Sequence, residues 1–156
     1  MSNEDASIKI IARNRKAFYD YEILETFEAG IMLQGTEVKS LRDGHVALAD
    51  GFGNFRGDEL YIVDLDIPQY SHGNINNHDP HRPRKLLVHR RELIKIRARV
   101  LERGLTMVPL KLYFKRGWAK VEMAIVRGKT RYDKRDSIRD REVDREIRRH
   151  SGRQGK

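Results

Sequence analysis

Residues 107–126, MVPLKLYFKRGWAKVEMAIV, constrain the fold more than any other stretch of the chain. Apolar residues alternate with polar or aromatic ones on both sides of Arg116-Gly117, which is typical of two antiparallel strands joined by a tight turn. The first strand should direct Leu110, Leu112 and Phe114 to one face, with these residues on the other: Lys111, Tyr113 and Lys115. The second strand repeats the apolar face with these residues: Ala119, Val121, Met123 and Ile125.

Other segments add strands and helices to this hairpin. Residues 19–33 predict a long strand with a bulge or bend near Gly30, and residues 52–67 predict a second hairpin that turns at 56–58. One helical turn should follow Asn14 as N-cap, and a short helix should end at Gly44. The clearest helix is 89–104, where the apolar stripe and the terminal glycine are these residues: Leu93, Ile96, Val100 and Gly104.

The order of these elements predicts a mainly β fold with about three helices. Several short strands with one helix before the last hairpin favour a small closed antiparallel barrel, and the OB-fold is the commonest such barrel that binds nucleic acid. Residues 68–84 are rich in Pro, Asn and His, so we expect a long loop there.

Charge divides the chain into two parts. The 156 residues hold 32 Lys+Arg against 23 Asp+Glu, a net charge of +9 that points to a polyanionic partner. Residues 127–156 alone hold 12 basic and 6 acidic residues, which is +6 of that total. We therefore expect a disordered N-terminus over 1–7, a folded body over 8–127 and a basic tail over 128–156.

Composition excludes several classes of protein. There is no cysteine, so disulfides, thiolate metal sites and cysteine nucleophiles are excluded. No apolar run is long enough to span a membrane, and the first residues lack the apolar core of a signal peptide, so we expect a cytoplasmic protein.

Residue patterns for catalysis or metal binding are weak. We find no phosphate-binding glycine loop and no HExxH motif. The loop histidines His72, His78 and His81 stand near Asp79, but their spacing is irregular and an exposed polar loop explains them better than a metal site. Two acidic pairs could suggest a metal-dependent nuclease but are better explained as solvated residues: Asp58/Glu59 and Asp64/Asp66. We predict no enzyme activity, no cofactor and no metal.

Basic clusters carry the stronger signal. Arg82, Arg84 and Lys85 stand together at the end of the loop. Three hairpin lysines alternate with two aromatic residues, as Lys111, Lys115 and Lys120 with Tyr113 and Trp118. Lysines beside flat rings supply phosphate contacts and stacking platforms, which favours RNA binding over a merely solubilising surface.

The tail cannot build a core of its own. Its few apolar residues, Ile138, Val143 and Ile147, make at most a thin stripe. Opposite charges recur at i,i+3 while like charges recur at i,i+4, so a helix there is marginal in isolation. We expect the tail to be disordered alone and to fold on an RNA partner, with a plain solubilising tail as the alternative.

Five motifs occur in order along the chain: NRKAFYDY, ETFEAGIMLQGTEVKSLRDG, NHDPHRPRKLLVHRRE, GLTMVPLKLYFKRGWAKVEMAIVRGK and YDKR. Together they resemble the small protein B family of bacterial SsrA-binding proteins. The resemblance implies an OB-fold-like barrel that binds the tRNA-like domain of transfer-messenger RNA (tmRNA) and brings it to stalled ribosomes. Elongation factor Tu and alanyl-tRNA synthetase would be partners through the tmRNA. The tail would become a helix in the empty mRNA channel.

The resemblance also assigns residues. Glu28, Leu87 and Lys120 match the tmRNA-binding surface. Further RNA contacts are expected at Asn14, Arg15, Lys16, Lys39 and Arg42, and the basic cluster of the loop adds Arg84 and Lys85. The hinge, the decoding-centre residue and the channel-binding segment would be Gly128, Lys129, Tyr132, Asp133, Lys134, Arg135, Arg139 and Arg141.

Two positions depart from the family pattern. His81 stands where Leu is usual, which affects loop packing, and Val143 stands near a position where some members have Trp. The competing hypothesis is another basic OB-fold protein that binds RNA or the ribosome in translation without tmRNA.

Overall fold

The computed structural model describes residues 7–71 and 77–128. Several predictions therefore lie outside the described residues. They concern the first six residues, the loop residue His72 and every tail residue from Lys129 onward.

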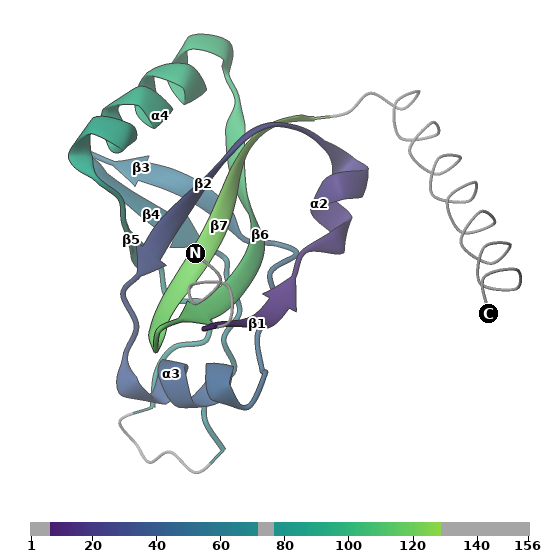
Figure 1. Cartoon of the computed structure of the whole chain (residues 1–156), viewed down its shortest axis with the longest axis vertical. Coiled ribbons are helices and arrows are strands. Elements are labelled where there is room, and N and C mark those ends of the chain that lie inside the picture. The colour runs from purple at the N-terminus through teal and green to yellow at the C-terminus, as the bar shows by residue number, and fades with distance from the viewer. Residues whose placement is uncertain (1–6, 72–76, 129–156) are drawn as a thin grey trace, which may run out of the picture.

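Seven strands form one antiparallel sheet that carries three helices (Figure 1). The elements along the chain are β1 (Ile8–Arg13), α2 (Arg15–Asp20), β2 (Tyr21–Ile31), α3 (Gly35–Arg42), β3 (Phe52–Arg56), β4 (Glu59–Val63), β5 (Arg84–Leu87), α4 (Arg90–Arg103), β6 (Thr106–Lys115) and β7 (Trp118–Gly128). The strand order is β1-β6-β7-β2-β5-β4-β3, so the long strands β2 and β7 lie in the middle. The prediction of a mainly β fold with about three helices is confirmed for the part of the chain that the structure describes.

The sheet curls so that its two ends approach each other. A Cβ atom added to Gly53 of β3 would lie 3.0 Å from the Met107 Cβ of β6. A side chain at this position would require Met107 to shift by a few tenths of an ångström, so glycine favours the close approach of the strands. Among the described strands, however, no hydrogen-bonded ladder joins β3 to β6 or β1, so closure of the predicted barrel is not shown.

Two hydrophobic clusters lie on opposite faces of the central strands. The main core contains apolar side chains of β2, β4, β6 and β7 together with Leu41 of α3 and Ile96 of α4. A second cluster under α2 consists of these buried residues: Ala17, Val108, Leu110, Ala124 and Val126. The end of β7 is buried on both faces, which explains why residues 123–126 form a continuous apolar run.

One strand pattern was predicted incorrectly at Leu110. The register between β6 and β7 shifts between Pro109 and Lys111, which leaves Leu110 in a bulge. A bulge inserts one residue and reverses the facing of the residues after it. Leu112 therefore points into the main core, while Leu110 points to the opposite face of the sheet and packs in the second cluster.

The bulge of β2 also lies away from its predicted place near Gly30. The register with β7 shifts between Ile23 and Glu25, so the irregularity is at Leu24. Gly30 instead sits in a regular ladder against Leu87 of β5. A Cβ atom there would be 3.3 Å from the Leu87 Cβ, so the glycine permits close packing of the two strands.

The helices and turns agree closely with the sequence. Asn14 caps α2 through a 3.2 Å hydrogen bond accepted from the Ala17 N–H, and Gly104 ends α4 with φ of 61°. The last hairpin turns at Arg116 and Gly117, both with positive φ. Two short strands were not predicted: β1, which pairs with β6, and β5, which lies at the end of the supposed loop. No helix in the described part of the chain is long and apolar enough to span a membrane.

Candidate nucleic-acid interface

Three residues that the resemblance singled out meet on the outer face of the sheet around Gly30. Gly30 pairs with Lys120 of β7 on one side and with Leu87 of β5 on the other. Glu28 lies two residues earlier on β2 and shares this face, because side chains alternate along a strand. Leu87 is 51% exposed. An acid, an apolar side chain and a cation are thus gathered on three neighbouring strands.

Glu28 is held by two neighbours from β6. The Tyr113 hydroxyl donates a hydrogen bond to Glu28 Oε2, and the Lys115 Nζ lies 3.5 Å from the same oxygen. Burial raises the pKa of Tyr113, and the bond to Glu28 raises it further, so the phenol keeps its proton. No described residue donates a hydrogen bond to Oε1, which leaves this oxygen open to a partner.

Tyr113 is therefore not the stacking platform that the sequence pattern suggested. Its side chain is buried, and the Lys111 ammonium lies 5.6 Å from the ring centroid. Trp118, at the start of β7, is 74% exposed and keeps its flat face available. Of the two aromatic residues in the predicted pattern, Trp118 at the hairpin turn is the one exposed for stacking on a base.

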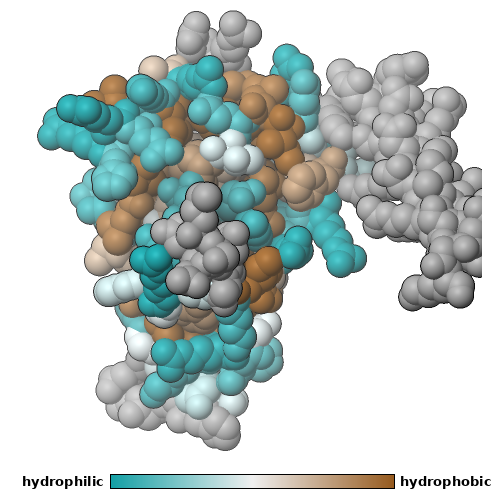
Figure 2. All heavy atoms as spheres, in the orientation of Figure 1, coloured by the Kyte–Doolittle hydropathy of each residue, from teal (hydrophilic) through white to brown (hydrophobic). Residues whose placement is uncertain are grey.

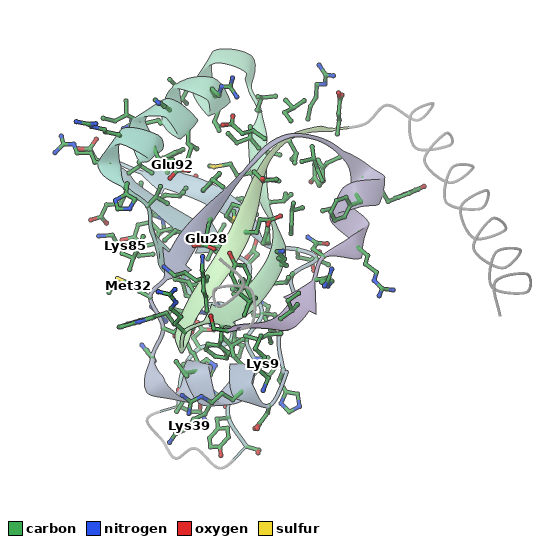
Figure 3. All side chains as sticks on the ribbon, viewed as in Figure 1. Lys9, Glu28, Met32, Lys39, Lys85 and Glu92 are labelled. Carbon is green, nitrogen blue, oxygen red and sulfur yellow. The ribbon has the colours of Figure 1, made fainter. Side chains whose placement is uncertain are left out.

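A hollow of about 540 Å³ adjoins this cluster. Its lining combines residues of the cluster with residues of β5 and of the start of α4: Glu28, Leu87, Lys120, Lys85, Arg90 and Glu92. Figure 3 shows Glu28, Lys85 and Glu92 on the same side of the molecule, from three different elements. Lys85 pairs with Glu59 at 3.0 Å, whereas Lys120 has no ion-pair partner among the described residues.

Arg84, predicted to bind RNA, is instead a core residue. Its side chain is fully buried, and its guanidinium binds the Glu37 carboxylate and donates a 2.7 Å hydrogen bond to the Leu65 carbonyl. Glu37 also accepts from Arg82 at 2.6 Å and from the Gln34 amide at 2.7 Å. Burial raises the pKa of Glu37, but these hydrogen bonds outweigh it and leave the pKa below its usual value. Arg84 cannot reach a phosphate without leaving the interior, so its role is structural.

Asn14 is a second correction of the same kind. Asn14 is only 4% exposed. Its Oδ1 accepts a hydrogen bond from the Ala17 N–H, and its Nδ2 donates a 2.9 Å hydrogen bond to the Pro109 carbonyl. The neighbours Arg15 and Lys16 are exposed on α2. Lys39 and Arg42 lie on α3. Figure 3 shows Lys39 at the lower end of the molecule, and its ammonium lies 5.7 Å from the centroid of the Tyr70 ring. The structure does not bring these cations to the Glu28 cluster.

His78 of the loop and the acidic pair Asp58 and Glu59 have contacts within the protein. His78 is buried, with Nδ1 at 2.8 Å from the Thr36 hydroxyl and Nε2 at 2.7 Å from the Ile67 carbonyl. Asp58 pairs with Arg97 at 3.2 Å. Hydrogen bonds from Lys85 and Tyr61 keep the pKa of Glu59 below its usual value. Within the described residues, no three His, Cys, Asp or Glu side chains are placed to hold a metal.

Sequence reasoning missed the partners of Glu28. The pairing of Lys115 and Tyr113 with Glu28 joins strands far apart in the chain, and it depends on the sheet order and on the bulge in β6. The alternation of lysine and aromatic residues placed both side chains on β6 but gave no information about which acid they would meet.

Known proteins resemble this chain over nearly its whole length. The family model described as SmpB protein matches residues 11–153. An SsrA-binding protein of Thermosipho melanesiensis is 53% identical over 90% of this chain and 97% of its own length. One of Pseudarthrobacter chlorophenolicus is 51% identical over 97% and 99%.

A solved structure also matches. It is described as "tmRNA-SmpB: a journey to the center of the bacterial ribosome", and it is 50% identical with a TM-score of 0.66 over 82% of this chain and 94% of its own. With the motifs in order, the sheet in place and matches of this extent, the chain belongs to the SmpB protein family.

Proposed function

We propose that this chain is the tmRNA-binding protein of trans-translation, and that the Glu28, Leu87 and Lys120 cluster is its RNA-binding surface. The relatives are named SsrA-binding proteins, and the description of the matching structure names tmRNA-SmpB and the bacterial ribosome. The observation that carries the site is the meeting of these three residues around Gly30. The family is one of RNA-binding proteins without enzymatic activity.

The geometry divides RNA recognition between three kinds of contact. Lys120 lacks a partner among the described residues and suits a phosphate, while the exposed Leu87 offers an apolar surface to a base or sugar. Glu28 repels phosphates, so its open Oε1 accepts a hydrogen bond from a donor on a base edge, such as an amino or imino group. Tyr113 and Lys115 fix this carboxylate in place before the RNA arrives.

The finer assignments rest on family membership. The curled sheet acts as an OB-fold-like barrel that grips the tRNA-like domain of tmRNA. The tail serves the decoding centre and the empty mRNA channel through Gly128, Lys129, Tyr132, Asp133, Lys134, Arg135, Arg139 and Arg141. Elongation factor Tu and alanyl-tRNA synthetase act with the chain through tmRNA, in the cytoplasm.

The function is tested by measuring the affinity for tmRNA in a gel-shift titration at one fixed salt concentration. The full chain should bind tmRNA tightly, and an excess of ordinary tRNA should not displace it. Equal binding of both RNAs would instead favour the competing hypothesis of a general basic translation protein.

A second arm tests the site with a matched pair of variants. Glu28→Gln should weaken tmRNA binding, whereas Glu25→Gln should not, although both acids are exposed on β2, because Glu25 pairs with Arg99. Equal effects of the two substitutions would remove Glu28 from the interface.

A further inference from the structure

Helix α4 presents a strongly basic face to solvent. Six of its fourteen residues are Lys or Arg and two are Glu. Leu93, Ile96 and Val100 face the main core. The opposite side exposes Arg91, Lys95 and, between them, Ile94, which is 60% exposed. Figure 2 shows hydrophilic residues around isolated apolar ones over this part of the surface.

The five cations of α4 whose side chains the structure describes fall into two groups. Arg97 pairs with Asp58 of the β3–β4 turn at 3.2 Å, and Arg99 pairs with Glu25 of β2. Arg90, Arg91 and Lys95 have no ion-pair partner among the side chains that the structure describes. The two groups therefore differ in whether their charge is available to a ligand.

The free group continues the candidate interface. Arg90 lines the hollow that also contains Leu87 and Lys120, so RNA that fills this hollow reaches the first turn of α4. Arg91 and Lys95 come next on the outer face, four residues and about 6 Å of helix axis apart. This rise is comparable to the separation of adjacent phosphates in a strand.

We infer that the tmRNA interface extends from the hollow along the outer face of α4, where Arg90, Arg91 and Lys95 bind successive backbone phosphates. The inference rests on the proposed function and names the path of the RNA across this protein. Ile94 packs against the sugar edge between two phosphates. The alternative occupants of this face are ribosomal RNA and an acidic protein surface.

Salt dependence distinguishes these possibilities, because each phosphate contact contributes about 0.7–0.9 to the slope of log K against log salt. The full chain and two double variants are titrated with tmRNA between 50 and 300 mM salt. Arg91→Gln with Lys95→Gln removes two free cations, and the control, Arg97→Gln with Arg99→Gln, removes two paired ones from the same helix. Both variants lose the same net charge.

The first variant should show a slope shallower by about 1.4–1.8 and an affinity roughly tenfold lower at 0.1 M salt. The control should stay within about twofold of the unchanged chain. The fold of each variant should be intact, because all four side chains are partly or fully exposed. Circular dichroism and thermal melting check this.

Four results would overturn the inference. If both variants change the slope equally, the effect is one of net charge and not of contact. If tmRNA binding is unchanged but association with small ribosomal subunits falls, the face belongs to the ribosome. If the unchanged chain itself fails to bind tmRNA, the proposed function fails together with the inference. If Lys120→Ala lowers the affinity for tmRNA but Arg91→Gln with Lys95→Gln does not, the proposed function stands and α4 lies outside the interface.

Discussion

Glu37 and Glu28 are both glutamates that accept hydrogen bonds from side chains far away in the sequence, but their surroundings differ. Glu37 is fully buried, and both of its oxygens are occupied by Arg82, Arg84 and the Gln34 amide. Glu28 keeps 40% of its side chain exposed, and both of its donors share one oxygen. A carboxylate whose two oxygens both accept hydrogen bonds within the protein stabilises the fold, whereas one with a free oxygen can also bind a partner.

The largest expected effect is on the buried side of this comparison. Glu37→Ala leaves Arg84 as an unpaired charge in the core and should lower the free energy of unfolding by about 3–5 kcal/mol. Urea denaturation followed by circular dichroism measures it. Glu25→Ala is the control, since its pair with Arg99 is exposed and its urea midpoint should not move. A loss below about 1 kcal/mol would mean that Arg84 finds other partners or water.

The exposed side should show the reverse pattern. Glu28→Gln should leave the urea midpoint unchanged but weaken tmRNA binding about 5- to 150-fold, because a base-edge contact is worth about 1–3 kcal/mol. The affinity is measured by fluorescence anisotropy at fixed salt. Unchanged affinity would place Glu28 outside the bound RNA. A large loss of stability would mean that Glu28, too, is structural.

Tyr113 connects the two behaviours, since it is buried but binds the exposed carboxylate. Tyr113→Phe removes only the donor to Glu28 and should weaken tmRNA binding a fewfold, less than Glu28→Gln does. In combination with Glu28→Gln it should cause no further loss, because both changes disable the same contact. Additive losses in this cycle would show that Tyr113 acts independently of Glu28.

The contribution of Glu37 to the stability of the fold should depend on pH. The folded-state pKa of Glu37 lies below its ordinary 4.5, so its stabilising contribution is complete above about pH 5 and is lost as the pH falls through the folded pKa. The stability difference between the unchanged chain and Glu37→Gln should therefore be constant from pH 5 to 7 and shrink below about pH 4.5. Urea midpoints at each pH measure this, and a difference that shrinks above pH 6 instead would contradict the assignment.

The sequence predicted the elements far better than their connections. The helix over 89–104, the cap at Asn14 and the turn at Arg116-Gly117 were correct because each depends on residues near one another in the chain. The strand β5 was missed because four residues carry too little periodicity. The facing of Leu110 was wrong because a bulge leaves no trace in the alternation that precedes it.

The site was predictable only through resemblance. Alternating lysines and aromatic residues identified a basic surface, but nothing local separates Arg84, which is buried, from Lys85, which is not. Their difference arises because Arg84 faces the core side of β5 and meets Glu37 of α3. A charge becomes structural or functional only when distant elements decide which face it occupies.

The position of β7 has a consequence for how the chain is made. This last strand lies in the middle of the sheet, where it pairs with β2 along nearly its whole length and with β6 on its other side. While it is being synthesised, the nascent chain exposes the apolar faces of β2 and β6 until Gly128 has left the exit tunnel. A chain that stops before Trp118 therefore lacks the strand that joins β2 to β6 in the described sheet.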